Sequence, residues 1–232
     1  MFREVKIAKN KKITKDIYLL KIRGEFKVKP GQFFMIKKEN SSMTLYRPIS
    51  VFECDEKELG FLYLVKGGGT QVLKELRKGD VLSIHGPYGN GFPEAKGKLC
   101  LIGGGIGMAP LYLCALNNPK AKLYIGLRED LYSDEEIQNI KNLFRNVDTH
   151  IKIGGTVIDD VRFDKYDTVF TCGPSVMMKI IGERHSNVYV SLEKHMGCAV
   201  GACLSCSCKT SEGMKKVCKD GPVFSAKEVD WE

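Results

Sequence analysis

The sequence predicts an α+β protein of three parts: an antiparallel β-barrel, a doubly wound parallel α/β sheet, and a short C-terminal module rich in cysteine. Three observations support this. Residues 1–93 alternate in short β-type runs, strands and helices alternate over residues 94–192, and five of the nine cysteines crowd into residues 193–232. These three ranges are the domain boundaries that we expect.

The composition is that of an ordinary soluble protein. Its 232 residues are 43% hydrophobic and 28% charged, which suffices for a sizeable core. No apolar run has the length of a membrane span, and the charged residues 1–6 lack the apolar core of a signal peptide. The formal charge of +8 is spread thinly, without an aromatic-interleaved basic tract. We therefore expect a cytoplasmic protein that binds neither membrane nor nucleic acid.

Short runs of alternating character predict the strands of the barrel. Turn residues such as Lys29-Pro30-Gly31 separate them. The expected strands are 5–7, 17–22, 32–36, 59–65 and 81–84, and only residues 71–76 look helical. The turn-rich stretch 86–93 ends this pattern.

Strands and helices alternate in the second part, which predicts a parallel sheet. The expected strands are 98–102, 122–127, 149–153, 166–172 and 188–192, and the expected helices are 109–116, 133–144 and 175–182. Ser133, with Glu136 three residues later, is expected to cap the second helix.

A glycine loop follows the first strand of this part. Glycines at 103, 104, 105 and 107 let the chain turn tightly and bring a helix N-terminus close to a dinucleotide pyrophosphate. Pro110 falls in the first turn of the helix, where its missing N–H costs little. Because the loop departs from the strict G-x-G-x-x-G pattern, a tight turn without a ligand remains open.

Acidic residues follow the second strand of this part. Glu129 and Asp130 can accept hydrogen bonds from an adenosine ribose and would repel a 2'-phosphate, whereas Arg128 would attract one. On balance the sequence favours NADH over NADPH.

Four cysteines have the spacing of a plant-type [2Fe-2S] ligand set. Cys198, Cys203 and Cys206 follow the pattern C-x4-C-x2-C, and Cys218 comes twelve positions later. The small residues between them suit a bent loop that points several sulfurs inward. We therefore predict that these four thiolates bind the cluster.

Alternatives to the cluster remain open at this point. Structural zinc would use a similar ligand set, although its ligands usually come as two C-x2-C pairs, and disulfides would require an oxidising compartment. Cys208 could replace Cys206, and His195 is a further ligand candidate. The cysteines at 54, 100, 114 and 172 are expected to pack as buried thiols.

Several motifs resemble those of the ferredoxin reductase superfamily. They are Arg47-Pro48-Ile49-Ser50, Gly67-Gly68-Gly69-Thr70, the G-G-x-G-x-x-P run at 103–110 and Cys172-Gly173-Pro174. The resemblance implies FAD, with Arg47, Gly69 and Thr70 at its phosphates, Pro48, Ile49, Ser50, Tyr63 and Leu64 beside its ring, and Leu62 as a further FAD contact. It also implies that NAD contacts Gly103, Gly104, Gly105, Gly107, Cys172, Gly173 and Pro174.

The order of these motifs, followed by the cysteine segment, resembles the electron transfer subunits of type B dihydroorotate dehydrogenase. The stretches 196–209 and 217–224 carry this resemblance most specifically. It implies FAD, one [2Fe-2S] cluster, NAD as co-substrate and a partner subunit with FMN and the dihydroorotate site, in a heterotetramer of pyrimidine biosynthesis. Electrons would pass from the partner through the cluster and FAD to NAD+, and no catalytic acid or base is expected in this chain.

Two other functions remain open on sequence grounds. One is a paralogous NAD(P)H:ferredoxin or sulfide dehydrogenase-type flavoprotein subunit, which would share the barrel and the sheet. The other is a zinc-stapled interaction module without redox activity. Gly67-Gly68 and the short span from Cys206 to Cys218 depart from the family pattern, which leaves the nicotinamide contacts in doubt.

Overall fold

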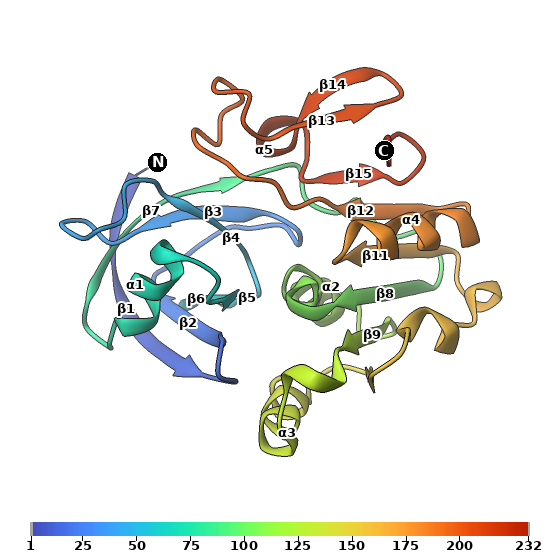
Figure 1. The fold of residues 1–232 in the computed structure, drawn as a ribbon, viewed down its shortest axis with the longest axis horizontal. Helices are drawn as coiled ribbons and strands as arrows, with labels where there is room; N and C mark the ends of the chain where they lie inside the picture. Colours follow the sequence, from blue (N-terminus) through green and yellow to red (C-terminus); the bar gives the residue numbers. More distant parts are fainter. Residues whose placement is uncertain (1, 232) are drawn as a thin grey trace.

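The computed structural model describes residues 2–231 and contains two large sheets that lie side by side (Figure 1). The first sheet has the order β4-β3-β7-β1-β2-β6-β5. Its strands are β1 (Phe2–Lys12), β2 (Ile17–Arg23), β3 (Phe33–Lys37), β4 (Arg47–Ser50), β5 (Glu53–Cys54), β6 (Glu58–Leu64) and β7 (Val81–Tyr88).

All neighbouring strands of the first sheet are antiparallel, as predicted. The sheet curls around the apolar side chains of its concave face, and helix α1 (Gly68–Glu75) covers one end. Within the described residues the edge strands β4 and β5 do not pair with each other, so the barrel is half open. Helix α1 begins three residues earlier than expected and therefore includes Gly69 and Thr70 in its first turn.

The second sheet has the order β10-β9-β8-β11-β12-β15 and is parallel except for its last strand. Its strands are β8 (Leu99–Gly104), β9 (Lys122–Leu127), β10 (Thr149–Ile153), β11 (Thr168–Cys172), β12 (Val188–Ser191) and β15 (Val223–Ser225). Its helices are α2 (Ala109–Asn117), α3 (Asp134–Leu143) and α4 (Ser175–Arg184).

Helices cover both faces of this sheet, because successive residues of a buried strand point to opposite sides. Leu101 packs with α2 and α3 on the side of the barrel, whereas Cys100 and Ile102 pack with α4 on the other. Ser133 caps α3 as predicted, since its hydroxyl accepts a hydrogen bond from the Glu136 amide at 3.3 Å. The predicted fold class is confirmed.

The C-terminal segment extends the second sheet instead of standing apart from it. It contains the hairpin of β13 (Ser207–Thr210) and β14 (Gly213–Lys216), the short helix α5 (Val217–Asp220) and β15. Strand β15 pairs antiparallel with β12, so Val190 lies opposite Phe224. The boundary expected at residue 193 therefore divides strands that share one sheet, and the three-part division remains a prediction.

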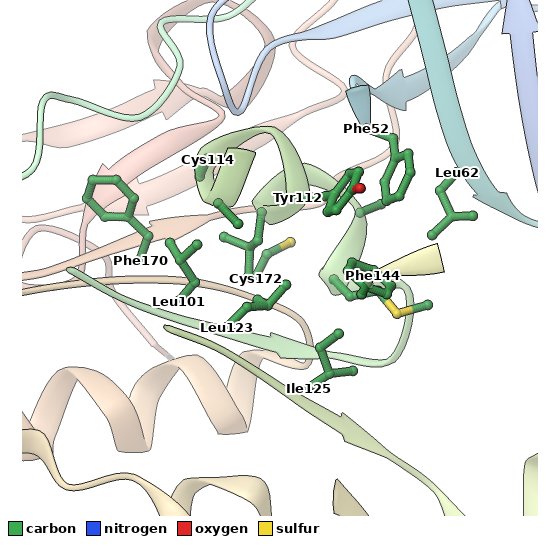
Figure 2. Packing of buried hydrophobic residues seen from close by; sticks show 14 of the residues in the cluster. Phe52, Leu62, Leu101, Tyr112, Cys114, Leu123, Ile125, Phe144, Phe170 and Cys172 are labelled. Carbon is green, nitrogen blue, oxygen red and sulfur yellow. The ribbon is translucent and has the colours of Figure 1, made fainter. Parts of the chain in front are cut away.

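A continuous apolar core joins the barrel to the α/β part (Figure 2). Phe52 of the barrel stacks on Tyr112 of α2 with ring centroids 4.3 Å apart, and Phe144 packs edge-on against both rings. Such contacts between large buried side chains give the two parts a fixed relative position.

Candidate functional site

A cavity of about 470 Å³ lies where the barrel, the parallel sheet and the C-terminal segment meet. Strands β3, β4 and β6, the start of α2, and the chain that follows β12 form its walls. Its lining consists of Phe33, Pro48, Ile49, Ser50, Leu62, Tyr63, Leu64, Lys66, Ile106, Ala109, Pro110, Ser191, Leu192, Glu193, Lys194, His195, Met196 and Pro222. A mostly apolar hollow of this size with a few polar groups is typical of a cofactor site.

The six residues of β4 and β6 that are predicted to contact FAD, apart from Arg47, all line this cavity. Strand β4 supplies Pro48, Ile49 and Ser50, and strand β6 supplies Leu62, Tyr63 and Leu64. Strand β4 is one edge of the curled sheet, and β6 is next to the opposite edge. Residues far apart in the sequence are thus brought to one wall.

Arg47 and the first turn of α1 form a group of donors beside the cavity. A Cβ atom on Gly69 would lie 2.3 Å from Arg47 Nε, so only glycine lets the guanidinium lie over the helix start. Arg47 Nη1 donates to the Leu45 carbonyl at 2.6 Å. The free amides of a helix N-terminus, next to a guanidinium, suit a pyrophosphate.

The Thr70 hydroxyl binds the backbone of this chain and not the space where a phosphate would lie. Its Oγ1 accepts hydrogen bonds from the amides of Lys66 and Gly67 at 2.9 and 3.2 Å and donates to the Gly67 carbonyl at 2.9 Å. The hydroxyl therefore caps α1, which leaves the backbone amide of Thr70 as its donor to a phosphate.

The glycine loop after β8 packs against the loop after β11. A Cβ atom would lie 2.8 Å from Met108 Cα at Gly103, 2.8 Å from Pro174 Cδ at Gly104 and 2.3 Å from the Cys172 carbonyl at Gly107. Protein packing thus accounts for three of the four glycines. Only Gly105, with φ +54°, faces open space where a ligand could approach.

Cys172 is buried, with 1% of its surface exposed, and is not among the residues that line the cavity. Burial raises the pKa of its thiol well above the ordinary value, and the nearby Glu193 carboxylate acts in the same direction. The sequence left a role beside the nicotinamide and a plain buried thiol equally open, and the position of Cys172 is that of a buried thiol at the junction of the two loops.

Three charged residues that line the cavity, Lys66, Glu193 and Lys194, were not singled out from the sequence. Burial raises the pKa of the Glu193 carboxyl, while the Lys66 ammonium partly opposes this effect. Glu193 is exposed to solvent as a residue, although protein surrounds its carboxyl on most sides. Its position two residues after β12 was the available signal, because ligands of open α/β sheets bind at the carboxyl ends of strands.

The four predicted cluster ligands lie as two pairs. The amides of Ala202 and Cys203 donate to Cys198 Sγ at 3.2 and 3.3 Å, and the Cys218 amide donates to Cys206 Sγ at 3.4 Å. Ala199 and Leu204 have φ near +60°, which gives the loop the sharp bends expected there.

The thiols of Cys198 and Cys218 differ in acidity, because hydrogen bonds act mainly on the first and burial mainly on the second. The hydrogen bond from the Cys203 amide, with others from the loop, lowers the pKa of Cys198 to about 6. Burial, together with the neighbouring Cys206 thiol, raises the pKa of Cys218 to about 12. The Cys203 thiol lies within hydrogen-bonding range of Cys198, and Cys206 within that of Cys218.

This pairing fits a binuclear cluster, in which each iron takes two thiolates. Among residues 2–231, no three His, Cys, Asp or Glu side chains are grouped closely enough to hold one metal ion. All nine cysteines are free thiols. Cys208 lies on β13 in an apolar cluster, and the His195 side chain is exposed at the cavity.

Comparison with known proteins identifies the family. The model of the iron-sulfur cluster binding domain of dihydroorotate dehydrogenase B matches residues 193–230. A protein of Clostridium acetobutylicum named dihydroorotate dehydrogenase B (NAD(+)), electron transfer subunit, is 39% identical over 97% of this chain and 95% of its own length. A protein of the same name from Clostridium perfringens is 42% identical, with 97% of both chains covered. This chain belongs to the dihydroorotate dehydrogenase B electron transfer subunits.

Solved structures with a similar fold include ferredoxin-NADP reductases. The structure of an NADH-dependent reduced ferredoxin-NADP oxidoreductase has a TM-score of 0.80 and 27% identity, and the match covers 98% of this chain and 90% of that one. A ferredoxin NADP+ reductase from Neisseria gonorrhoeae with bound FAD and NADP has a TM-score of 0.60 at 17% identity, covering 78% and 89%, and shows the fold alone. Because relatives that cover nearly the whole chain are named as electron transfer subunits of dihydroorotate dehydrogenase B, the paralogous reductases and the zinc-stapled module are not favoured.

Membership of this family makes the chain a component of an NAD-dependent oxidoreductase, and the family name implies a catalytic partner subunit. In the part of the chain that the structure describes, no helix has both the length and the apolar character needed to cross a bilayer.

Proposed function

We propose that this electron transfer subunit binds FAD in the cavity and a [2Fe-2S] cluster at Cys198, Cys203, Cys206 and Cys218. Arg47 and the amides of Gly69 and Thr70 would hold the FAD pyrophosphate, and the cavity residues of β4 and β6 would flank the ring. The glycine loop and residues 172–174 would receive NAD. In this proposal FAD exchanges electron pairs with NAD, and the cluster relays single electrons to the FMN of the partner subunit.

One observation supports this proposal above the others: the cavity and the cysteine loop share one stretch of chain. Glu193, His195 and Met196 line the cavity, and Cys198 follows two residues later. Pro222 also lines the cavity, four residues after Cys218. A flavin ring and a cluster held at these positions would lie close together without an intervening linker.

The residues of this chain provide binding and tuning. Arg47 and α1 supply positive charge where a pyrophosphate would lie. The amides that donate to Cys198 Sγ and Cys206 Sγ stabilise negative charge on sulfur, which raises the reduction potential of an attached cluster.

Anaerobic purification with a visible spectrum and analysis of flavin, iron and zinc tests the proposal. We expect one FAD and two irons per chain, as a [2Fe-2S] cluster requires. Arg47→Ala should lose FAD but keep iron, whereas Cys203→Ser should lose the cluster spectrum but keep FAD. Cys54→Ser, which changes a cysteine of the barrel, is the matched control. A colourless protein that contains zinc would refute the proposal.

The partner and the location complete the proposal. Co-purification with an FMN-containing catalytic subunit and the mass of the complex would test the expected heterotetramer. A complex that lacks FMN, or a protein that remains alone when both subunits are co-expressed, would contradict it. The cytoplasmic location stays a prediction from the sequence.

A further inference from the structure

The stretch that ends the barrel pattern, residues 86–93, makes a specific contact that neither FAD nor the cluster ligands explain. Within it, Asn90 donates from its backbone amide to the Gly221 carbonyl at 2.7 Å. Its side-chain Nδ2 donates to the carbonyls of Asp220 and Val223 at 3.0 and 2.9 Å. Its Oδ1 accepts from the Val223 amide at 3.3 Å. One asparagine thus makes four hydrogen bonds to a segment 130 residues away in the sequence.

The segment that Asn90 binds connects the cysteine cluster with the cavity. It begins just after Cys218, in the last residue of α5, and ends in β15. Between these points Pro222 lines the cavity, and its carbonyl accepts a hydrogen bond from the Leu192 amide at 2.9 Å. The position of this segment therefore determines how far the fourth cluster ligand lies from the cavity.

Gly89, the residue before Asn90, packs closely against the same segment. Gly89 has φ +88°, and a Cβ atom there would lie 2.4 Å from Pro222 Cδ. On the opposite side, Gln32 Nε2 donates to the Gly89 carbonyl at 2.8 Å, and Phe33, the next residue, lines the cavity. Residues 89 and 90 are thus held between the barrel wall of the cavity and the chain that follows Cys218.

We propose that Asn90 is a positioning residue that fixes residues 218–222 against the cavity and so sets the spacing between flavin and cluster. This inference rests on the proposed function, because it assumes FAD in the cavity and a cluster at the four thiols. Asn90 touches neither group. It acts through Pro222 and the backbone around it, using both the donor and the acceptor of its side chain.

A purely structural role predicts a different result from a positioning role. If Asn90 only stabilised the fold, its loss would weaken every function of the subunit together. If it sets the spacing, its loss slows electron transfer between flavin and cluster while the reduction of flavin by NADH is unchanged. Asn187 offers a matched control, since its Nδ2 also donates to a carbonyl, that of Asp167 at 2.9 Å, at the opposite end of the sheet.

The experiment compares Asn90→Ala and Asn187→Ala in the complete complex with the catalytic subunit. Flavin and iron contents are measured first. If the wild-type protein lacks flavin or iron, the proposed function is wrong, which is a different outcome from failure of the inference about Asn90. Stopped-flow absorbance after mixing with NADH then separates flavin reduction from cluster reduction. NADH delivers two electrons to the flavin, and each cluster accepts one electron from it. We expect Asn90→Ala to slow cluster reduction about tenfold or more and flavin reduction by less than twofold.

A second measurement does not depend on turnover. Amide hydrogen exchange of residues 217–225 should become faster in Asn90→Ala and stay unchanged in Asn187→Ala. Gly89→Ala, which would push against Pro222, should slow the same electron transfer step. The inference is wrong if cluster reduction keeps its wild-type rate in Asn90→Ala, or if Asn187→Ala slows it equally. Should Asn90→Ala fail to fold, Asn90→Asp, which keeps the acceptor but loses the donor, decides by the same criteria.

Discussion

Arg128 and Asp130 form a closed ion pair at the carboxyl end of β9. The guanidinium donates to both carboxylate oxygens, at 2.8 and 3.3 Å, and the hydrogen bond from Arg128 lowers the pKa of Asp130. A guanidinium that is already paired attracts a 2'-phosphate less strongly than a free one. The pair therefore supports the expectation from the sequence that NADH is favoured over NADPH, which stays a prediction.

Removing the carboxylate of this pair should shift cofactor preference. We expect Asp130→Asn to raise kcat/KM for NADPH relative to NADH by about three- to fivefold, the size of effect typical of an exposed charge pair. Rates of flavin reduction by each nucleotide measure this ratio. Arg128→Gln in the same background should restore the wild-type ratio, and an unchanged ratio in Asp130→Asn would contradict the role of the pair.

Glu193 should make stability depend on pH. Because burial raises its pKa in the folded protein, the unfolded chain releases this proton first, so in that pH range the unfolded state binds fewer protons. Stability should therefore fall as pH rises from the ordinary carboxyl pKa, about 4.3, through the raised folded value, and then level off.

Glu193→Gln should lack this fall in stability. The variant should match wild type near pH 4 and be more stable at pH 8, by less than about 1 kcal/mol because solvent reaches the carboxyl. Urea unfolding at both pH values measures the difference. A wild-type protein that is more stable than the variant at pH 8 would reverse the expected sign.

At the scale of elements, helix α3 ties the α/β part to the turn between β1 and β2. Both hydrogen bonds of its capping box are formed: the Ser133 hydroxyl accepts from the Glu136 amide, and Glu136 Oε2 accepts from the Ser133 amide at 3.0 Å. The other oxygen of Glu136 accepts from the Lys15 amide, and Asn139 Nδ2 donates to the Ile13 carbonyl at 3.2 Å. The cap therefore fixes the helix start and a contact between two parts of the molecule.

Loss of the cap should be measurable in the free energy of unfolding. We expect Ser133→Ala to lower it by about 1 kcal/mol, the usual cost of removing a Ser N-cap. Gln138→Ala, an exposed change within the same helix, should leave it within about 0.5 kcal/mol of wild type. Equal effects of the two substitutions in urea unfolding would show that the cap contributes nothing.

The elements that could be predicted from the sequence are those with a local signal. The bounds of β9 and β10 are those expected, because β9 is a mostly apolar run and β10 alternates polar and apolar residues, and the Ser133 cap has its own signature. Strand β15 has only three residues and is defined by its pairing with β12, which no local pattern reveals. The helical start of α1 was missed because glycine is a poor helix former.

In the candidate site, too, the residues with a local sequence signal could be predicted and those placed by distant packing could not. Pro48, Ile49 and Ser50 belong to a recognisable motif, and the structure brings them to one cavity with the predicted FAD contacts Leu62, Tyr63 and Leu64, while their contact with FAD stays a prediction. Phe33, Lys66 and Pro222 could not be predicted, because only the packing of three distant segments places them there. The reason for the glycines at 104 and 107 was also hidden, since their neighbours lie in the loop after β11.

At the scale of the whole molecule, the stack of Phe52 on Tyr112 holds the barrel against the parallel sheet (Figure 2). Phe52 is fully buried, and Phe144 closes the group from the side. The cavity lies along the same boundary, with walls from both parts. Loosening this stack should therefore weaken both folding and the binding of a flavin between the parts.

A double-mutant cycle tests this connection. We expect Phe52→Ala to cost about 3–5 kcal/mol of unfolding free energy. The coupling with Tyr112→Ala should be about 0.5–1.5 kcal/mol, because the two rings stack directly. Phe170, which stacks on Phe92 at the other end of the same core in Figure 2, provides the comparison. Phe52→Ala and Phe170→Ala should be additive, since they share no stacking partner. Retention of flavin affinity in Phe52→Ala, despite the lost stability, would show that the cavity does not depend on this contact.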